Sequence, residues 1–130
     1  MFETTFPIRE YADVVAFEAA GFEVMPMRVP HYGLLSFGFR IAGPDAVLAY
    51  SADSGPADAL VDLARDADLF VCEATLAESG EKGARGHLSL EEAAAAFEAS
   101  GARRLLVTHR PAELPAAGFE QARDGLELDF

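Results

Sequence analysis

The chain has 130 residues, of which 51% are hydrophobic and 25% charged, a composition typical of a soluble globular domain. Its net charge of −12 would repel the phosphate backbone of nucleic acids, which argues against a free-standing nucleic-acid-binding protein. No segment has the continuous apolarity of a membrane span, and the first residues lack a basic region followed by an apolar run, so we expect a cytoplasmic protein. The single cysteine, Cys72, lies in an apolar segment and is expected to be a buried, unreactive thiol.

The first third of the chain has the alternating pattern of antiparallel strands. Residues 14–19 fit either a helix or a strand, and the glycine at position 21 favours a hairpin with strands at about 14–18 and 22–29. Both faces of 22–29 are partly apolar, which is typical of a strand that is covered on both sides or lies at an interface. A turn at 30–33 leads into a strand in which every second residue from 35 to 41 is large and apolar.

Strands and helices alternate after residue 44. Strands are predicted at 46–50, 69–73 and 104–108, with a helix at about 57–67 that begins at Pro56. Ser89 and Glu92 form a capping-box pattern before a second helix, which is expected to end at Ser100 and Gly101. The polar segment 77–86 is expected to be a mobile loop. The tail is expected to contain a short helix from Gly118, a turn at 124–125 and a last strand at 126–130, so that residues 1–130 form a single α/β domain.

Each predicted α/β strand ends on a residue that can ligate metal or transfer protons. Asp53 follows the strand at 46–50, Glu73 ends the strand at 69–73 and His109 follows the strand at 104–108. Because the carboxyl ends of parallel strands meet at one edge of a sheet, these side chains are expected to lie at a common rim. His87, just before the second helix, is a fourth candidate, and the set suits metal ligation or acid–base catalysis.

Each of these residues also has an ordinary structural explanation. Asp53 could cap the helix that follows it, a role that Ser54 could also fill. Glu73 could form an ion pair with Arg85 or Arg103, His87 could be a loop histidine, and His109 could be a histidine at the edge of the core. Each explanation is sufficient for one residue alone, but four such residues at successive strand ends favour a site.

Four motifs occur in the order found in one enzyme superfamily. SADSGP at 51–56 resembles the Ser-Gly-Asp-Thr-Gly turn of the metallo-β-lactamase superfamily. CEAT at 72–75, GHLS at 86–89 and LLVTHRP at 105–111 resemble the His-Glu-Ala-Thr, Gly-His-Ser-Thr and Thr-His stretches of its ribonuclease Z-like branch. VPHYGLLSFGFRI at 29–41 looks like the hairpin of that branch, so the resemblance extends from about residue 22 to residue 109.

The resemblance implies an α/β fold that is half of an αββα sandwich, a mixed sheet with helices on one face. It implies a metal-dependent hydrolase, with phosphodiesters as the candidate substrate, in which Asp53 bridges two zinc or manganese ions and His109 ligates one of them. Glu73 would hold the imidazole of His87, and His87 would protonate the leaving oxygen. His31, in the hairpin turn, is either a surface residue or a contact to the substrate or to the site residues.

The chain departs from the family pattern in two ways. Ala52 replaces a glycine, Cys72 replaces a histidine, and Leu88 and Ser89 replace a Ser-Thr pair. The superfamily's upstream His-x-His-x-Asp-His motif is not found in residues 1–30. Since a catalytic zinc ion takes about three protein ligands and the match supplies two, we expect the chain to be incomplete as an enzyme by itself. Its partner would be either the missing N-terminal half or a second copy in a homodimer; the alternative is a non-catalytic half-domain that self-associates.

Overall fold

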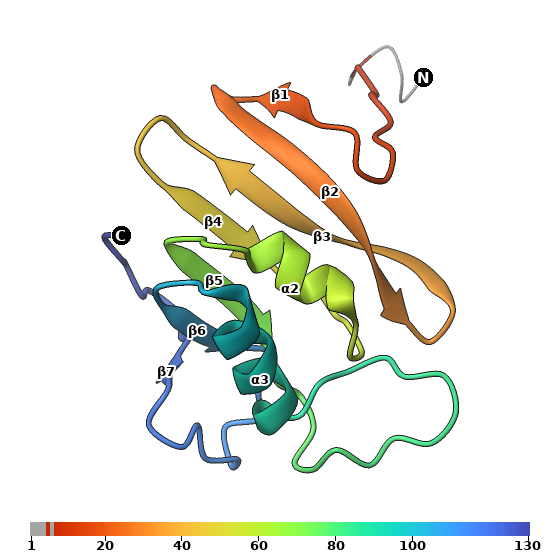
Figure 1. The fold of residues 1–130 in the computed structure, drawn as a ribbon, viewed down its shortest axis with the longest axis vertical. Coiled ribbons are helices and arrows are strands. Elements are labelled where there is room, and N and C mark those ends of the chain that lie inside the picture. Colours follow the sequence, from red (N-terminus) through yellow and green to blue (C-terminus); the bar gives the residue numbers. More distant parts are fainter. Residues whose placement is uncertain (1–4, 6) are drawn as a thin grey trace.

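The computed structural model describes residue 5 and residues 7–130, and these contain a mixed seven-stranded sheet with its strands in chain order (Figure 1). The first four strands pair antiparallel and the last four pair parallel. The strands are β1 (Phe17–Ala19), β2 (Phe22–His31), β3 (Leu34–Ala42), β4 (Val47–Tyr50), β5 (Leu69–Glu73), β6 (Leu105–Thr108) and β7 (Glu120–Gln121). The mixed α/β sheet predicted from the sequence is confirmed.

The hairpins differ from the prediction mainly at their ends. β1 begins at Phe17 rather than near residue 14, because Val14 has a φ of 55° and cannot continue an extended strand. β2 runs to His31, so the turn is confined to Tyr32 and Gly33, with φ values of 49° and 79°. Two residues with positive φ form the compact turn that matches the twist of a β-hairpin.

Both described helices lie over the same face of the sheet (Figure 1). α2 (Asp58–Ala64) begins two residues after Pro56, and its N-cap, Ala57, makes no side-chain hydrogen bond. The prediction that Pro56 opens the helix is therefore wrong, and Asp53 is not its cap. α3 (Leu90–Ser100) has the predicted capping box between Ser89 and Glu92. It ends at Gly101 in the left-handed conformation, with a φ of 71°.

In the tail, the predicted turn at 124–125 is present and is closed by a 3.1 Å hydrogen bond from the Leu126 N–H to the Arg123 carbonyl, but the predicted helix and last strand are wrong. Ala117 and Gly118 have φ values of 49° and 88°, which interrupt the expected helix, and the chain instead adds the two-residue strand β7 beside β6. Residues 126–130 form no strand; the Asp129 carbonyl accepts a hydrogen bond from Arg104. None of the described helices is long and apolar enough to cross a membrane.

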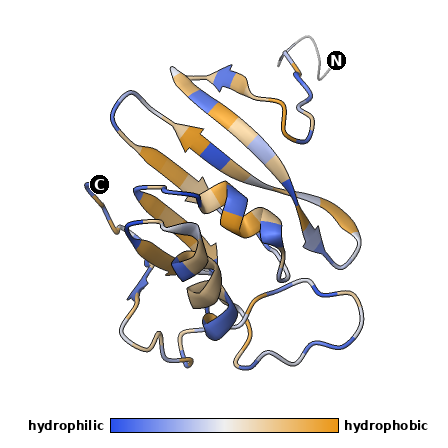
Figure 2. Ribbon diagram, in the orientation of Figure 1, coloured by the Kyte–Doolittle hydropathy of each residue, from blue (hydrophilic) through white to orange (hydrophobic). Residues whose placement is uncertain are grey.

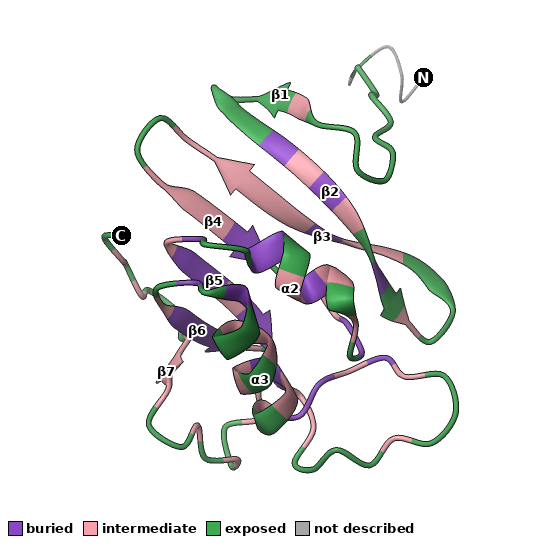
Figure 3. Cartoon of the chain, viewed as in Figure 1, coloured by how far each residue is buried: buried purple, intermediate pink, exposed green. Residues whose placement is uncertain are grey.

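The two faces of the sheet are covered to different degrees. On one face, Leu60, Leu63 and Ala64 of α2 pack with Phe70 and Val107 of the central strands in the buried core. Buried residues therefore concentrate where the helices cover the strands, whereas β1 and β3 have mostly partly exposed or exposed residues (Figure 3).

The opposite face carries a continuous apolar surface, which we call the open face. It consists of alternate residues of three adjacent strands, in which Phe39 pairs with Tyr50, Ile41 with Leu48, and Tyr50 with Val71. Its members are Leu35, Phe37, Phe39, Ile41, Leu48, Tyr50 and Val71. The strands that carry it are strongly hydrophobic (Figure 2), yet all seven residues remain partly or largely exposed. Tyr11 covers part of it, with its ring 5.3 Å from that of Phe37 and 5.5 Å from that of Phe39.

Candidate metal and acid–base site

The four predicted site residues meet at the carboxyl end of the parallel strands. Asp53, Glu73, His87 and His109 each offer one ligand atom, and these atoms all lie within 4.8 Å of one another. Asp53 lies in the turn after β4, Glu73 at the end of β5, and His109 directly after β6. Parallel pairing of these strands brings together residues that are distant in the sequence.

Asp53 and His109 form the exposed side of the site. Oδ1 of Asp53 lies 3.1 Å from Nδ1 of His109, and about half of each side chain is exposed. Thr75, which the sequence did not single out, places its hydroxyl oxygen 3.0 Å from His109 Nδ1 and also donates to the His109 carbonyl. His109 and Ala52 adopt φ values of 49° and 52°, a left-handed conformation that is strained for residues with a β-carbon.

Glu73 forms the buried side of the site. Its side chain is fully buried and accepts hydrogen bonds from the backbone N–H groups of Ser54, Thr75 and Leu88 at 3.0, 3.0 and 3.2 Å. A fourth bond, of 2.7 Å, comes from Nδ1 of His87. These four donors offset the cost of burying the carboxylate, so Glu73 serves as a hydrogen-bonding centre rather than an exposed ligand.

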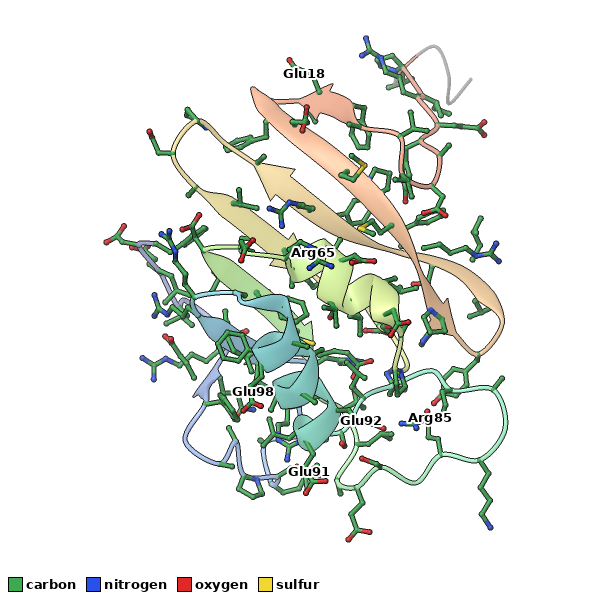
Figure 4. The ribbon with its side chains drawn as sticks, viewed as in Figure 1. Glu18, Arg65, Arg85, Glu91, Glu92 and Glu98 are labelled. Atoms are coloured by element: carbon green, nitrogen blue, oxygen red, sulfur yellow. The ribbon has the colours of Figure 1, made fainter. Side chains whose placement is uncertain are left out.

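The proposed ion pairs of Glu73 with arginine are not formed. Arg85 instead lies between Glu81 and Glu92, with an Nη2–Oε2 distance of 2.9 Å to Glu92 at the start of α3 (Figure 4). Arg103 pairs with Asp68. The hydrogen-bond partners of Glu73 are therefore His87 and three backbone N–H groups.

His87 joins the two sides of the site. Because Glu73 accepts at Oε1, Nδ1 of His87 carries the proton, which leaves Nε2 available for proton transfer or ligation. The His87 side chain is 15% exposed, and its ring centroid lies 5.5 Å from that of His109. This is the geometry expected of an imidazole oriented by a carboxylate.

His31 lies beside the site but outside the four-residue group. Its Nδ1 is 2.9 Å from the Gly86 carbonyl oxygen, and its ring centroid is 5.1 Å from that of His87. It therefore contacts a site residue, one of the two alternatives that the sequence left open.

The chemistry of the donor set suits a divalent metal ion. An exposed carboxylate, Asp53, and an imidazole, His109, are the ligand types that zinc and manganese take in proteins. Because Glu73 already accepts four hydrogen bonds, Asp53, His87 and His109 are the members of the group that remain for a metal ion.

A family model described as a beta-lactamase superfamily domain matches residues 3–110. The chain belongs to this superfamily. A solved structure, the metallo-beta-lactamase fold protein YhfI from Bacillus subtilis, has the same fold, with a TM-score of 0.71, 24% identity, and coverage of 78% of this chain and 42% of that chain. The resemblance found in the motifs is therefore confirmed.

The relatives found by sequence include an uncharacterized protein and a ribonuclease. An uncharacterized protein of Mycobacterium leprae is 40% identical over 107 residues, which are 82% of this chain and 37% of that protein. Ribonuclease BN of Escherichia coli is 41% identical over 68 residues, 51% of this chain and 22% of the enzyme.

Two further solved structures resemble the chain. The short form of human tRNase Z is 31% identical, with a TM-score of 0.61 and coverage of 72% of this chain and 38% of that chain. Zinc-bound PqqB from Methylobacterium extorquens has the same fold, with a TM-score of 0.71 at 20% identity, covering 92% of this chain and 55% of that chain. The chain thus spans well under two thirds of the length of the relatives that it matches.

Proposed function

We propose that the chain provides the second half of a metal-dependent hydrolase that cleaves phosphodiesters. The observation that carries the proposal is the grouping of Asp53, Glu73, His87 and His109 within 4.8 Å. Ribonuclease BN and tRNase Z, whose names denote cleavage of RNA phosphodiesters, are related in sequence and support the substrate class. The net charge of −12 favours a small phosphodiester over RNA as the substrate of this chain.

Asp53 and His109 would hold the metal, zinc or manganese, in a two-ion site. When bound, such ions supply an activated water and stabilise the charge that develops on phosphorus-bound oxygens. Glu73 keeps the proton on Nδ1 of His87 and fixes the orientation of the ring. As an imidazolium paired with the Glu73 carboxylate, His87 would donate its Nε2 proton to the leaving oxygen and return to the neutral form that keeps the proton on Nδ1, which is general acid catalysis.

The remaining ligands would come from a polypeptide that covers the open face. The chain spans 37% of the Mycobacterium leprae protein and 38% of human tRNase Z, so the occupant that we propose is the N-terminal half of the same fold. A second copy of the chain is the competing occupant, and it would make the chain a self-associating half-domain. The open face supports association with either occupant, because an exposed apolar surface of this kind marks a site of protein–protein contact.

Metal content and mass in solution test the proposal together. We expect the chain, when assembled with the N-terminal half of a relative, to bind zinc or manganese and to hydrolyse bis(p-nitrophenyl) phosphate. D53A and H109A should each remove most of the bound metal, because each deletes one of only two ligands that the chain contributes. D45A, which removes an exposed carboxylate at the opposite end of β4, is the matched control and should leave metal content unchanged.

The outcomes separate the alternatives. Equal metal content in D53A, H109A and the unaltered chain would overturn the assignment of the ligands. A stable homodimer that binds metal without the N-terminal half would replace the proposed partner with a second copy. A homodimer without metal would favour the non-catalytic half-domain.

A further inference from the structure

The segment before His87 is fastened to the β2–β3 hairpin rather than lying free. The hydroxyl of Tyr32, in the hairpin turn, donates a hydrogen bond to Oε1 of Glu81. The Tyr32 backbone N–H donates to the Arg85 carbonyl at 3.1 Å. In Figure 1 the long connection between β5 and α3 accordingly passes beside the tip of the hairpin. We call the pair of side chains the Tyr32–Glu81 clasp.

Glu81 also accepts hydrogen bonds from the backbone next to the His87 imidazole. Its other carboxylate oxygen accepts from the N–H groups of Gly86 and His87 at 3.0 and 3.2 Å. The hydrogen bonds from Gly86 first, and then from Tyr32, lower the pKa of Glu81 to about 2, so the carboxylate is ionised at neutral pH. The Glu81 carboxylate thus binds both the hairpin turn, through Tyr32, and the backbone of Gly86 and His87.

The aromatic rings of the hairpin complete the enclosure of His87. The Tyr32 ring centroid lies 5.5 Å from that of His87 with an interplanar angle of 75°, an edge-on contact. A β-carbon at Gly86 would collide with the Tyr32 ring, so glycine is required for this approach.

The hairpin end of the clasp is itself fixed to the Asp53 turn. The Gly55 N–H donates to the Pro30 carbonyl at 2.7 Å, and a β-carbon at Gly55 would lie 2.7 Å from the Cβ of Arg85. The end of β2 at Pro30 and the two loops that contain Gly55 and Arg85 therefore pack against one another. This packing gives the clasp a rigid base on the same turn that presents Asp53.

From these contacts we infer that Tyr32 and Glu81 are positioning residues that hold the His87 imidazole in line with Glu73. The inference rests on the proposed role of His87 as the proton donor. Without the clasp, the Gly86 and His87 amides would lose their shared acceptor, and the segment before His87 would be held by the His31–Gly86 contact and the Arg85–Glu92 ion pair. A proton donor needs a fixed orientation, since rotation of the ring removes Nε2 from the leaving atom.

Nuclear magnetic resonance of the 130-residue chain tests the inference. Y32F deletes only the hydroxyl of the clasp, and Y11F is the matched control, because Tyr11 packs on Phe37 and Phe39 away from the site. In the unaltered chain and in Y11F we expect a His87 ring Nδ1–H signal that is protected by the hydrogen bond to Glu73. In Y32F this signal should broaden or exchange with solvent at least about tenfold faster.

The variant E81A and amide hydrogen exchange distinguish two roles of the clasp: orienting the His87 ring, and only attaching the loop to the hairpin. E81A removes the acceptor of the Gly86 and His87 amides and should accelerate their hydrogen exchange together with the loss of the ring signal. If Y32F and E81A change amide exchange while the Nδ1–H signal stays as in Y11F, the clasp only fastens the loop and the inference is overturned. Absence of the signal from the unaltered chain would overturn it as well.

Activity of the assembled enzyme gives an independent check. With bis(p-nitrophenyl) phosphate we expect Y32F to lower kcat about tenfold with KM and metal content unchanged. An assembled enzyme without any hydrolysis would count against the proposed function alone, because the ring signal reports the position of His87 without catalysis. Equal kcat in Y32F and in the unaltered assembled enzyme would overturn the positioning role.

Discussion

At the scale of single residues, the site is built on backbone conformations that its residue types do not favour. Ala52 and His109 both adopt a left-handed φ, of 52° and 49°, on either side of the Asp53–His109 contact. A residue with a β-carbon pays for this conformation in strain, whereas glycine does not. The family's glycine at the position of Ala52 therefore has a physical reason, and the alanine here keeps the turn at a cost in stability.

Replacing Ala52 by glycine tests this reading. We expect A52G to raise the free energy of unfolding by about 0.5–1 kcal/mol, because it relieves the strained φ. A59G is the matched control: Ala59 lies inside α2, where glycine should lower stability by a similar amount. Urea denaturation measures both variants, and a loss of stability in A52G would show that Ala52 is not strained.

The site also depends on residues that the sequence pattern does not mark. Thr75 bonds His109, although it was noted only as the end of the CEAT motif at 72–75. Glu81 bonds the backbone of His87, although it lies in segment 77–86, which was predicted only as a mobile loop. By contrast, Cys72 was correctly expected to be buried, and burial raises the pKa of its thiol to about 12. Hydrophobic context predicts burial well, but a hydrogen-bond partner distant in the sequence leaves no local pattern.

At the scale of elements, α2 and the end of β4 pack closely against β3 at one glycine. Gly38 of β3 has no room for a side chain: a β-carbon would lie 2.8 Å from the Tyr50 carbonyl oxygen and 2.9 Å from a methyl carbon of Leu63. The absence of a side chain lets α2 approach the sheet directly before the Asp53 turn.

Alanine at position 38 should therefore lower the stability of the protein and displace the end of β4 that leads to Asp53. We expect G38A to lower the free energy of unfolding by about 1–3 kcal/mol, the usual cost of overpacking a core. G80A is the control, since nothing lies within 4 Å of a β-carbon there, and it should change stability by less than about 0.5 kcal/mol. Thermal or urea unfolding measures the stability of both variants. Equal stability of G38A and the unaltered chain would mean that α2 can shift to accommodate the added methyl group.

At the scale of the whole molecule, the chain has one covered and one open face. The helices bury one side of the sheet, and the open face leaves aromatic and aliphatic residues such as Tyr50, which is 39% exposed, in contact with solvent. Exposed apolar surfaces of this kind mark sites of association. The partner that we propose, the N-terminal half of the same fold, would cover this face of the sheet.

A charge placed on the open face should prevent that association. We expect Y50R to weaken binding of the N-terminal half at least about tenfold, because the interface would have to bury an unpaired guanidinium. A95R adds the same charge to an exposed position of α3 on the covered side and should bind normally. Sedimentation at micromolar concentration measures the binding, and undiminished binding of Y50R would exclude the open face as the interface.

The sequence by itself determined the order of the strands and helices, the caps of α3 and the four candidate site residues. Each of these depends on local patterns: alternation, a capping box, or a polar residue at the end of an apolar run. The sequence erred where short-range signals were weak, at the start of α2 and in the tail after residue 117, where positive φ values at Ala117 and Gly118 interrupt the expected helix.

Only the tertiary structure decided how the site residues divide their work. It surrounds Glu73 with four donors and so assigns it to His87 rather than to an arginine. It also fastens the segment before His87 to the hairpin turn through Tyr32 and Glu81. These contacts join residues up to 49 positions apart, as between Tyr32 and Glu81, and no local preference in the sequence encodes a partner at that distance.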